Sequence, residues 1–273
     1  MIDSHVHFWN FDPVRDSWIT SDMGAIRKDF LPNDFVDATS STQISGCVAV
    51  QADQTEAQNH FLLDLAKANP VIMGIVGWIE LVNPALEERL EFWQKQELIK
   101  GWRHVLQAEN ESFMLQKDFV EGIKKLKKYN YTYDLLCYHN QLSSILKLVD
   151  RLDEQPFILD HCGKPNVKSQ ELREWEMNIQ DLAQNPNVYC KVSGLLAEAD
   201  WLNWTEQEIF NCLDIVFKHF GTNRILYGSD WPVMLISRPY QDWFNLIKKY
   251  ISQFNETEQQ AIFTNNAVKF YNL

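Results

Sequence analysis

The segment Ile2-Asp3-Ser4-His5-Val6-His7-Phe8 begins the chain with a short run of β-prone and polar residues. Seven more short runs rich in Val, Ile and aromatic residues follow, and longer stretches with helical periodicity separate them. The eight expected strands are residues 2–8, 46–51, 72–79, 99–106, 131–138, 156–161, 188–193 and 225–230. Eight strands that each precede a helical stretch, in a chain of 273 residues, predict the α/β class and a (β/α)8 TIM barrel.

The helical stretches support this arrangement. We expect helices within residues 56–68, 84–95, 118–129, 141–152, 171–184, 209–220 and 240–250. Thr205 with Glu208 resembles a capping box that opens one of them. A doubly wound open sheet is the alternative fold, but the glycine fingerprint that usually follows an early strand in that fold is absent. Because no segment has the composition of a linker, we assign residues 1–273 to one domain.

Residues 10–31 differ from the rest of the chain. They carry Trp18 and Phe30 but show little periodicity, so we expect a loop. A loop of this length usually has a function, and we place it over the barrel mouth, meaning the end where the strands finish.

Composition excludes several classes of partner. The chain has 25 Lys+Arg against 37 Asp+Glu, a net charge of −12, and no basic stripe, which predicts no binding to nucleic acid or to anionic membranes. No apolar run approaches the length of a membrane span, and the first expected strand leaves no room for a signal peptide. The 5 cysteines are scattered without CxxC spacing, so we expect reduced thiols and a cytoplasmic protein.

Polar residues gather where the expected strands end, which is where TIM barrels carry their active sites. Five of the seven histidines fall there: His5, His7, His104, His139 and His161. Alternate residues of a strand share a face, so His5 and His7 are expected side by side. Imidazole is the commonest neutral metal ligand and the usual acid/base group near neutral pH. The pattern therefore predicts a catalytic or metal-binding site.

Structural roles remain open for individual residues. Asp230 lies in Tyr-Gly-Ser-Asp-Trp-Pro, where it could simply cap the turn before Pro232. Asp160 directly precedes His161, so strand alternation points it to the opposite side and favours a structural role. Lys164 follows the same strand either as a solvated loop residue or as a positive charge at the pocket rim. His139 lies near or past its strand end, and its role stays open.

Five motifs together resemble the amidohydrolase superfamily. They are His5-Val6-His7-Phe8-Trp9, Gly101-Trp102-Arg103-His104, Asp160-His161-Cys162-Gly163-Lys164-Pro165, Lys191-Val192-Ser193-Gly194 and Gly228-Ser229-Asp230-Trp231-Pro232. Within the superfamily the chain resembles the sugar-lactonase branch, which includes L-fuconolactonase, L-rhamnonolactonase and 2-pyrone-4,6-dicarboxylate lactonase. The likeness extends from residue 2 to residue 271.

The resemblance implies a role for each matching residue. Asp230, His5, His7 and His161 match the catalytic set, with Asp230 as general base, and the same four would be the ligands of any bound metal. The residues expected to bind substrate are Arg103, His104, Trp9, Tyr138 and Lys164. Binuclear members carry a bridging lysine where this chain has Arg103-His104, and arginine cannot be carbamylated in its place. We therefore expect one divalent metal, zinc first, or none.

These implications predict a hydrolase that opens the ester ring of a sugar lactone by Asp-assisted attack of water. The alternative is a lyase that decarboxylates an unsaturated or aromatic acid on the same barrel, since fold alone does not decide function. A non-catalytic sugar-acid binding protein is the third reading, and the histidine cluster beside Asp230 argues against it. The expected partner is a small-molecule sugar lactone, and the sequence leaves open whether the chain forms a homo-oligomer.

Overall fold

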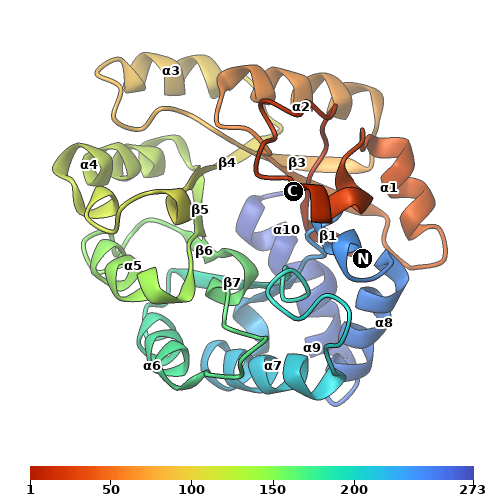
Figure 1. The fold of residues 1–273 in the computed structure, drawn as a ribbon. Coiled ribbons are helices and arrows are strands. Elements are labelled where there is room, and N and C mark those ends of the chain that lie inside the picture. Colours follow the sequence, from red (N-terminus) through yellow and green to blue (C-terminus); the bar gives the residue numbers. More distant parts are fainter.

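A computed structural model describes residues 1–273 and has the predicted architecture, a ring of eight parallel strands surrounded by helices (Figure 1). The strands are β1 (Ile2–Val6), β2 (Gly46–Val50), β3 (Ile72–Gly77), β4 (Ile99–Val105), β5 (Thr132–Leu136), β6 (Phe157–Leu159), β7 (Val188–Val192) and β8 (Ile225–Tyr227). They pair in sequence order. An isolated parallel bridge between Val6 and Trp231 joins the two ends of the sheet, so the (β/α)8 prediction is confirmed.

Ten α-helices accompany the strands. They are α1 (Pro32–Thr39), α2 (Glu56–Ala68), α3 (Leu86–Trp93), α4 (Lys117–Leu126), α5 (Leu142–Val149), α6 (Arg173–Leu182), α7 (Glu206–Phe220), α8 (Tyr240–Ile251), α9 (Glu256–Gln260) and α10 (Asn266–Tyr271). The predicted capping box is present, because Thr205 and Glu208 satisfy each other's backbone N–H groups at the start of α7. Sequence periodicity missed α1, α9 and α10, which are short.

Helix α10 closes one end of the barrel. Its buried residues Ala267, Phe270 and Tyr271 form an apolar cluster with residues of the strands. In Figure 1 this helix lies behind the ring of strands. Because this end is filled, a ligand has to approach from the opposite end, the mouth. None of the helices is long and apolar enough to cross a membrane.

All eight strands end earlier than predicted, and site residues in left-handed backbone follow two of them, β6 and β8. β6 ends at Leu159 and continues into a tight turn in which His161 and Cys162 have φ of 54°. Asp230 lies beyond the end of β8 with φ of 62°. Left-handed backbone is uncommon outside glycine and is enriched at functional sites. The turn also breaks strand alternation, so our expectation that Asp160 points away from His161 is wrong: both are buried and both contact the same cluster.

The segment 10–31 is a loop as predicted, apart from one 3-10 turn at Ser21–Ile26. Its base is fixed by two backbone hydrogen bonds between Trp9 and Phe30, with N···O distances of 3.0 and 2.9 Å. In Figure 1 this red coil lies in front of the strands, beside α1 and α2. It therefore forms part of the wall around the mouth.

Candidate active site

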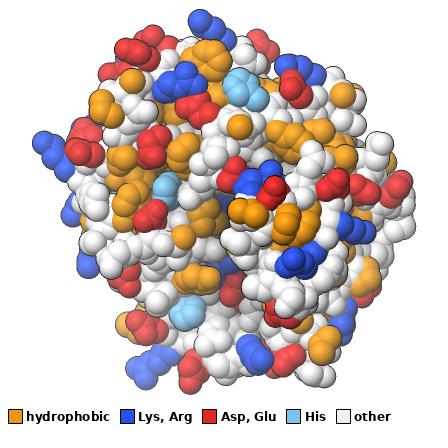
Figure 2. Space-filling view, turned by 45° about the horizontal axis from the view of Figure 1, so that its top comes forward, with side chains coloured by type: hydrophobic (Ala, Val, Ile, Leu, Met, Phe, Trp, Pro, Cys, Tyr) orange, Lys and Arg blue, Asp and Glu red, His pale blue; other side chains and the backbone are white.

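A cavity of about 370 Å³ opens at the barrel mouth. The strand ends contribute His7, Arg103, His161 and Asp230 to its floor, and the loop 10–31 contributes Arg15 and Trp18 to its wall. Seen from outside, hydrophobic and charged side chains gather around a hollow near the centre of this face (Figure 2). The cavity therefore brings together polar residues that lie far apart in the sequence.

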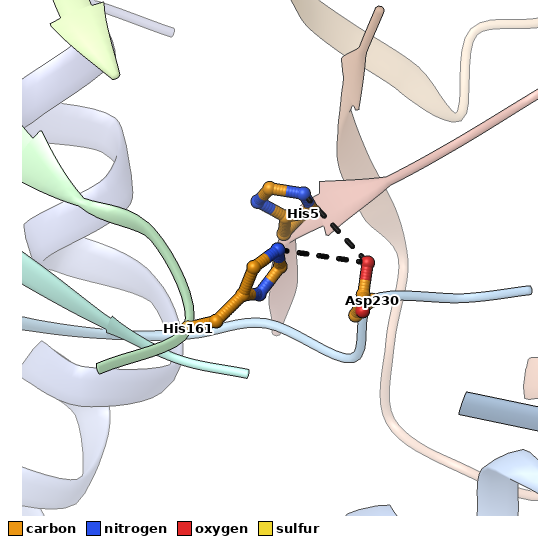
Figure 3. Close-up of side chains that lie close together, drawn as sticks. All are labelled: His5, His161 and Asp230. Atoms are coloured by element: carbon orange, nitrogen blue, oxygen red, sulfur yellow. Dashed lines mark ion pairs between the residues drawn. The ribbon is translucent and has the colours of Figure 1, made fainter. Parts of the chain in front are cut away.

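The four residues expected to be catalytic converge at the bottom of this cavity. Figure 3 shows His5 from β1, His161 from the turn after β6 and Asp230 from the segment after β8 pointing toward one another. Asp230 Oδ1 lies 3.8 Å from His5 Nε2, 3.9 Å from His161 Nε2 and 3.4 Å from His7 Nε2. The Nε2 atoms of His5 and His7 are 3.2 Å apart. Three imidazoles thus surround one carboxylate oxygen.

Neighbouring groups orient two of these imidazoles. His7 Nδ1 lies 2.8 Å from the backbone oxygen of Val50, which accepts its proton and leaves the Nε2 lone pair facing the cluster. His161 Nδ1 lies 2.9 Å from Ser193 Oγ. Gly194 follows with φ of 65°, and a Cβ at this position would meet the His161 ring at 2.5 Å. The Ser-Gly pair therefore both holds the imidazole and leaves room for it.

Burial and proximity keep these groups in a reactive charge state. Burial lowers the pKa of His5 well below its usual value and lowers the pKa of His161 to about 4, so both are neutral near pH 7. Burial alone would raise the pKa of Asp230, but the electrostatic effect of the surrounding imidazoles of His161, His7 and His5 outweighs it and holds the pKa below the usual range. An ionised carboxylate beside neutral imidazoles can accept a proton.

The same atoms are a suitable donor set for one metal ion. His5, His161 and Asp230 each offer a ligand atom, and these atoms lie within 4.8 Å of one another. Tetrahedral zinc with bonds of about 2.0–2.1 Å separates neighbouring ligands by about 3.3 Å, close to the 3.2 and 3.4 Å that His7 Nε2 makes here. Nitrogen and carboxylate donors are those that zinc prefers in catalytic sites. The residues present therefore fit a single ion.

A buried cluster of charged side chains lies directly beneath the histidines. The sequence analysis predicted little of this cluster. Lys191 Nζ lies 2.5 Å from Asp134 Oδ2 and 2.9 Å from Asp160 Oδ1, and all three side chains are fully buried. Arg103 Nη1 donates to Asp160 Oδ2 at 3.1 Å. The signal in the sequence was a charged residue in the middle of an otherwise apolar strand. Such a residue is buried only together with a partner.

The residues expected to bind substrate divide into two groups. Arg103, Trp9 and Lys164 line the cavity. His104 does not, because alternation along β4 turns it outward, where its ring stacks on Phe113 at 5.1 Å. Tyr138 lies at the surface beside the Lys164 ammonium, which is 5.4 Å from its ring centre.

The remaining rim residues also differ in position. His139 is partly exposed and its Nδ1 lies 3.0 Å from the backbone oxygen of Lys164, and it does not line the cavity. Trp18 lines the cavity and packs edge-on against Trp9, with ring centres 6.0 Å apart. Trp102 and Trp231 are buried in the core instead.

Comparison with known proteins agrees with this geometry. The model of the amidohydrolase family matches residues 2–273. The chain is 34% identical over 284 residues to an L-fucono-1,5-lactonase of Burkholderia multivorans, covering 100% of this chain and 96% of that protein. A crystal structure of an amidohydrolase from Burkholderia multivorans with bound Zn superimposes with a TM-score of 0.96 at 34% identity, covering 100% and 99% of the two chains.

A more distant structure shares only the fold. A dihydroxybenzoic acid decarboxylase from Polaromonas sp. JS666 superimposes with a TM-score of 0.68 at 15% identity, covering 100% of this chain and 96% of that one. The chain belongs to the amidohydrolase family.

Proposed function

We propose that this protein hydrolyses the ester ring of a neutral sugar lactone, with L-fucono-1,5-lactone as the first substrate to test. The observation that carries the proposal is the ionised Asp230 among His5, His7 and His161 at the floor of the cavity. The full-length likeness to an L-fucono-1,5-lactonase supports the choice of substrate.

The charges around the cavity favour an uncharged substrate. Every cation in the lining has a carboxylate beside it: Arg15 pairs with Asp16 at 2.7 Å, Arg103 with Asp160 at 3.1 Å and Lys164 with Glu198 at 3.0 Å. Two further carboxylates, Asp53 and Asp230, line the cavity and leave it with an excess of negative charge. An aromatic carboxylate or a dicarboxylated pyrone would be repelled here, which argues against the decarboxylase alternative.

The rest of the lining suits a sugar ring. Trp9 and Trp18 offer apolar faces, and the amide side chains of Gln51, Gln54 and Gln107 offer donors and acceptors for hydroxyl groups. A mostly apolar pocket with a few polar groups is the usual form of a small-molecule site. Its volume leaves room for a single lactone ring.

We assign Asp230 as the base in this reaction. Asp230 accepts a proton from water, and the resulting hydroxide attacks the lactone carbonyl carbon. Negative charge then grows on the carbonyl oxygen, where preorganised donors contribute about 3–4 kcal/mol each. Arg103 lines the cavity with Nη1 3.3 Å from His5 Nε2, and we assign it as a fixed positive charge for that oxygen.

Ring opening completes the reaction. The tetrahedral intermediate collapses, the bond between the carbonyl carbon and the ring oxygen breaks, and Asp230 returns its proton to that oxygen as it leaves. Proton transfer by one such group contributes roughly 10²–10⁴-fold. A zinc ion held by His5, His7, His161 and Asp230 would add Lewis-acid polarisation of the carbonyl and lower the pKa of water.

A substrate panel tests the proposal. Purified protein would be assayed for acid release from neutral aldonolactones and from 2-pyrone-4,6-dicarboxylate, and for carbon dioxide release from a dihydroxybenzoate. We expect turnover of neutral lactones and at least tenfold lower kcat/KM for either anion. The same assays after chelation and after zinc addition measure the metal contribution. Carbon dioxide release, or preference for an anion, would refute the assignment.

A further inference from the structure

The least expected contact in the site joins a lysine to a histidine. Lys191 Nζ lies 3.1 Å from His5 Nδ1, and both side chains are fully buried. An ammonium has three N–H donors and no acceptor. Lys191 also donates to Asp134 at 2.5 Å. Because the ammonium only donates, it can hydrogen-bond to His5 Nδ1 only when that nitrogen carries no proton. This contact favours the tautomer of His5 with its proton on Nε2.

A second neighbour of the same nitrogen has the opposite requirement. Asp160 Oδ1 lies 3.3 Å from His5 Nδ1 and 2.9 Å from Lys191 Nζ. An ionised carboxylate accepts but cannot donate. A hydrogen bond to Asp160 is therefore available only to the tautomer of His5 with its proton on Nδ1.

The other side of the His5 ring shows the same division. His7 Nε2, 3.2 Å from His5 Nε2, is an acceptor because the His7 proton lies on Nδ1 toward Val50. It therefore favours a proton on His5 Nε2. Arg103 Nη1, 3.3 Å from the same atom, is a donor and favours a bare Nε2. Asp230 Oδ1, 3.8 Å from the same nitrogen, is a further acceptor, so three neighbours favour a proton on Nε2 and two favour a proton on Nδ1.

We propose that Lys191 and Asp160 are positioning residues that set the metal affinity of this site in opposite directions through the tautomer of His5. In the metal-free protein Lys191 and His7 hold the proton on Nε2. A metal would need the lone pair of His5 Nε2. The proton on Nε2 would then leave, a proton would be taken up at Nδ1, and Asp160 would accept a hydrogen bond from Nδ1. His5 stays neutral in both states, and a carboxylate that accepts a hydrogen bond from the other ring nitrogen raises the basicity of a metal-binding imidazole.

All three parts of this arrangement come from motifs singled out in the sequence: His5 from His-Val-His-Phe-Trp, Asp160 from Asp-His-Cys-Gly-Lys-Pro and Lys191 from Lys-Val-Ser-Gly. The proposal concerns the metal site and holds whatever the substrate is. Its failure can therefore be told apart from failure of the lactonase proposal, because none of its measurements uses a substrate.

Nitrogen NMR of ¹⁵N-histidine-labelled wild-type protein gives the direct test. Without metal, we expect the His5 signals, assigned by comparison with a His5→Gln variant, to show a protonated Nε2 and a bare Nδ1. With zinc, we expect a protonated Nδ1. A protonated Nδ1 in the metal-free protein, or no change of tautomer with zinc, would overturn the proposal.

Zinc affinity, measured by competition with a chromophoric chelator, gives the second test. Asp160→Asn should weaken zinc binding by about 10–100-fold, the usual loss for an outer-shell partner. The double variant Lys191→Met/Asp134→Asn keeps the net charge of the wild type and should bind zinc about tenfold more tightly than the wild type, because the competing donor is gone. Equal or weaker binding by the double variant overturns the proposal. If the double variant does not fold, the wild-type NMR result decides alone.

Discussion

Two charged regions border the cavity, and they are built in opposite ways. Lys191 in the barrel interior is fully buried and joins Asp134, Asp160 and His5, which come from three other parts of the chain. Arg15 on the loop 10–31 is partly exposed and bonds only its neighbours, the Asp16 carboxylate and the Asn10 backbone oxygen.

We expect the interior cluster and the loop 10–31 to have different functions. The interior cluster depends on closure of the barrel, so a change at one residue disturbs all its partners. The loop holds its own cation, so it can vary without disturbing the chemistry below. Barrel enzymes commonly keep reactivity on strand ends and vary selectivity in loops. We infer that the strands carry the reaction here and that the loop selects the lactone.

The largest expected effect belongs to the interior. Asp230→Asn keeps the size of the side chain but cannot accept a proton, so turnover of a lactone should fall by roughly 10²-fold or more. The fold should survive because Asn, like Asp, tolerates the φ of 62° at this position. Turnover and melting temperature of the variant measure the two effects. Near-normal turnover would remove the general-base assignment, and a collapsed melting temperature would make Asp230 a turn residue.

Arg103→Ala should show the next largest effect, and it should combine lost turnover with lost stability. Arg103 faces the cavity but also donates to Asp160 and to the backbone oxygen of Gln51, with N···O distances of 3.1 and 2.6 Å. Breaking a buried ion pair costs about 3–5 kcal/mol. We expect turnover to fall by roughly tenfold and the melting temperature to drop, as measured by kinetics and calorimetry.

Arg89→Ala is the matched control for that variant. Arg89 pairs with Glu56 on the outer helices, where both side chains are partly exposed. An exposed pair contributes about 0–1 kcal/mol. The control should therefore leave turnover unchanged and the melting temperature nearly so. Equal effects of the two variants would mean that the interior is no more sensitive than the surface.

A smaller effect is expected from pH. The pKa of His161 is lowered to about 4 by burial, so activity should stay level from about pH 8 down to pH 5 and fall by about half near pH 4. Stability should decline from about pH 6.5 toward pH 4, because the unfolded chain takes up the proton that folded His161 refuses. Rates and melting temperatures in one buffer series test both. A midpoint near 6.5 would mean that His161 is not desolvated.

The sequence predicted the barrel and the main residues of the site for a clear reason. Strand ends of a TIM barrel meet at one rim, so periodicity placed His5, His7, His161 and Asp230 there among other polar residues, and the motif resemblance singled out these four. Alternation along β4 also explains why Arg103 lines the cavity and His104 does not, although the sequence analysis grouped them. Adjacent residues of a strand point to opposite faces, and this rule alone separates Arg103 from His104.

Other features depend on geometry that a sequence pattern does not contain. The left-handed turn at His161 brings Asp160 into the interior against strand alternation. Lys191 and Asp134 become partners only because β7 and β5, which lie on either side of β6, both point these side chains into the barrel interior, where Tyr271 of α10 donates to Asp134 at 2.8 Å from below. Pairing of this kind follows from barrel closure.

The most direct measurement of the division between strands and loop is kcat/KM across one panel of neutral lactones for three proteins. Wild type is compared with Asp160→Asn in the interior and with Trp18→Ala on the loop. We predict that Asp160→Asn lowers every kcat/KM by a similar factor and keeps the order of substrates, whereas Trp18→Ala changes the order by several-fold and leaves the highest kcat nearly intact. A changed order with Asp160→Asn, or a uniform loss with Trp18→Ala, would contradict the account.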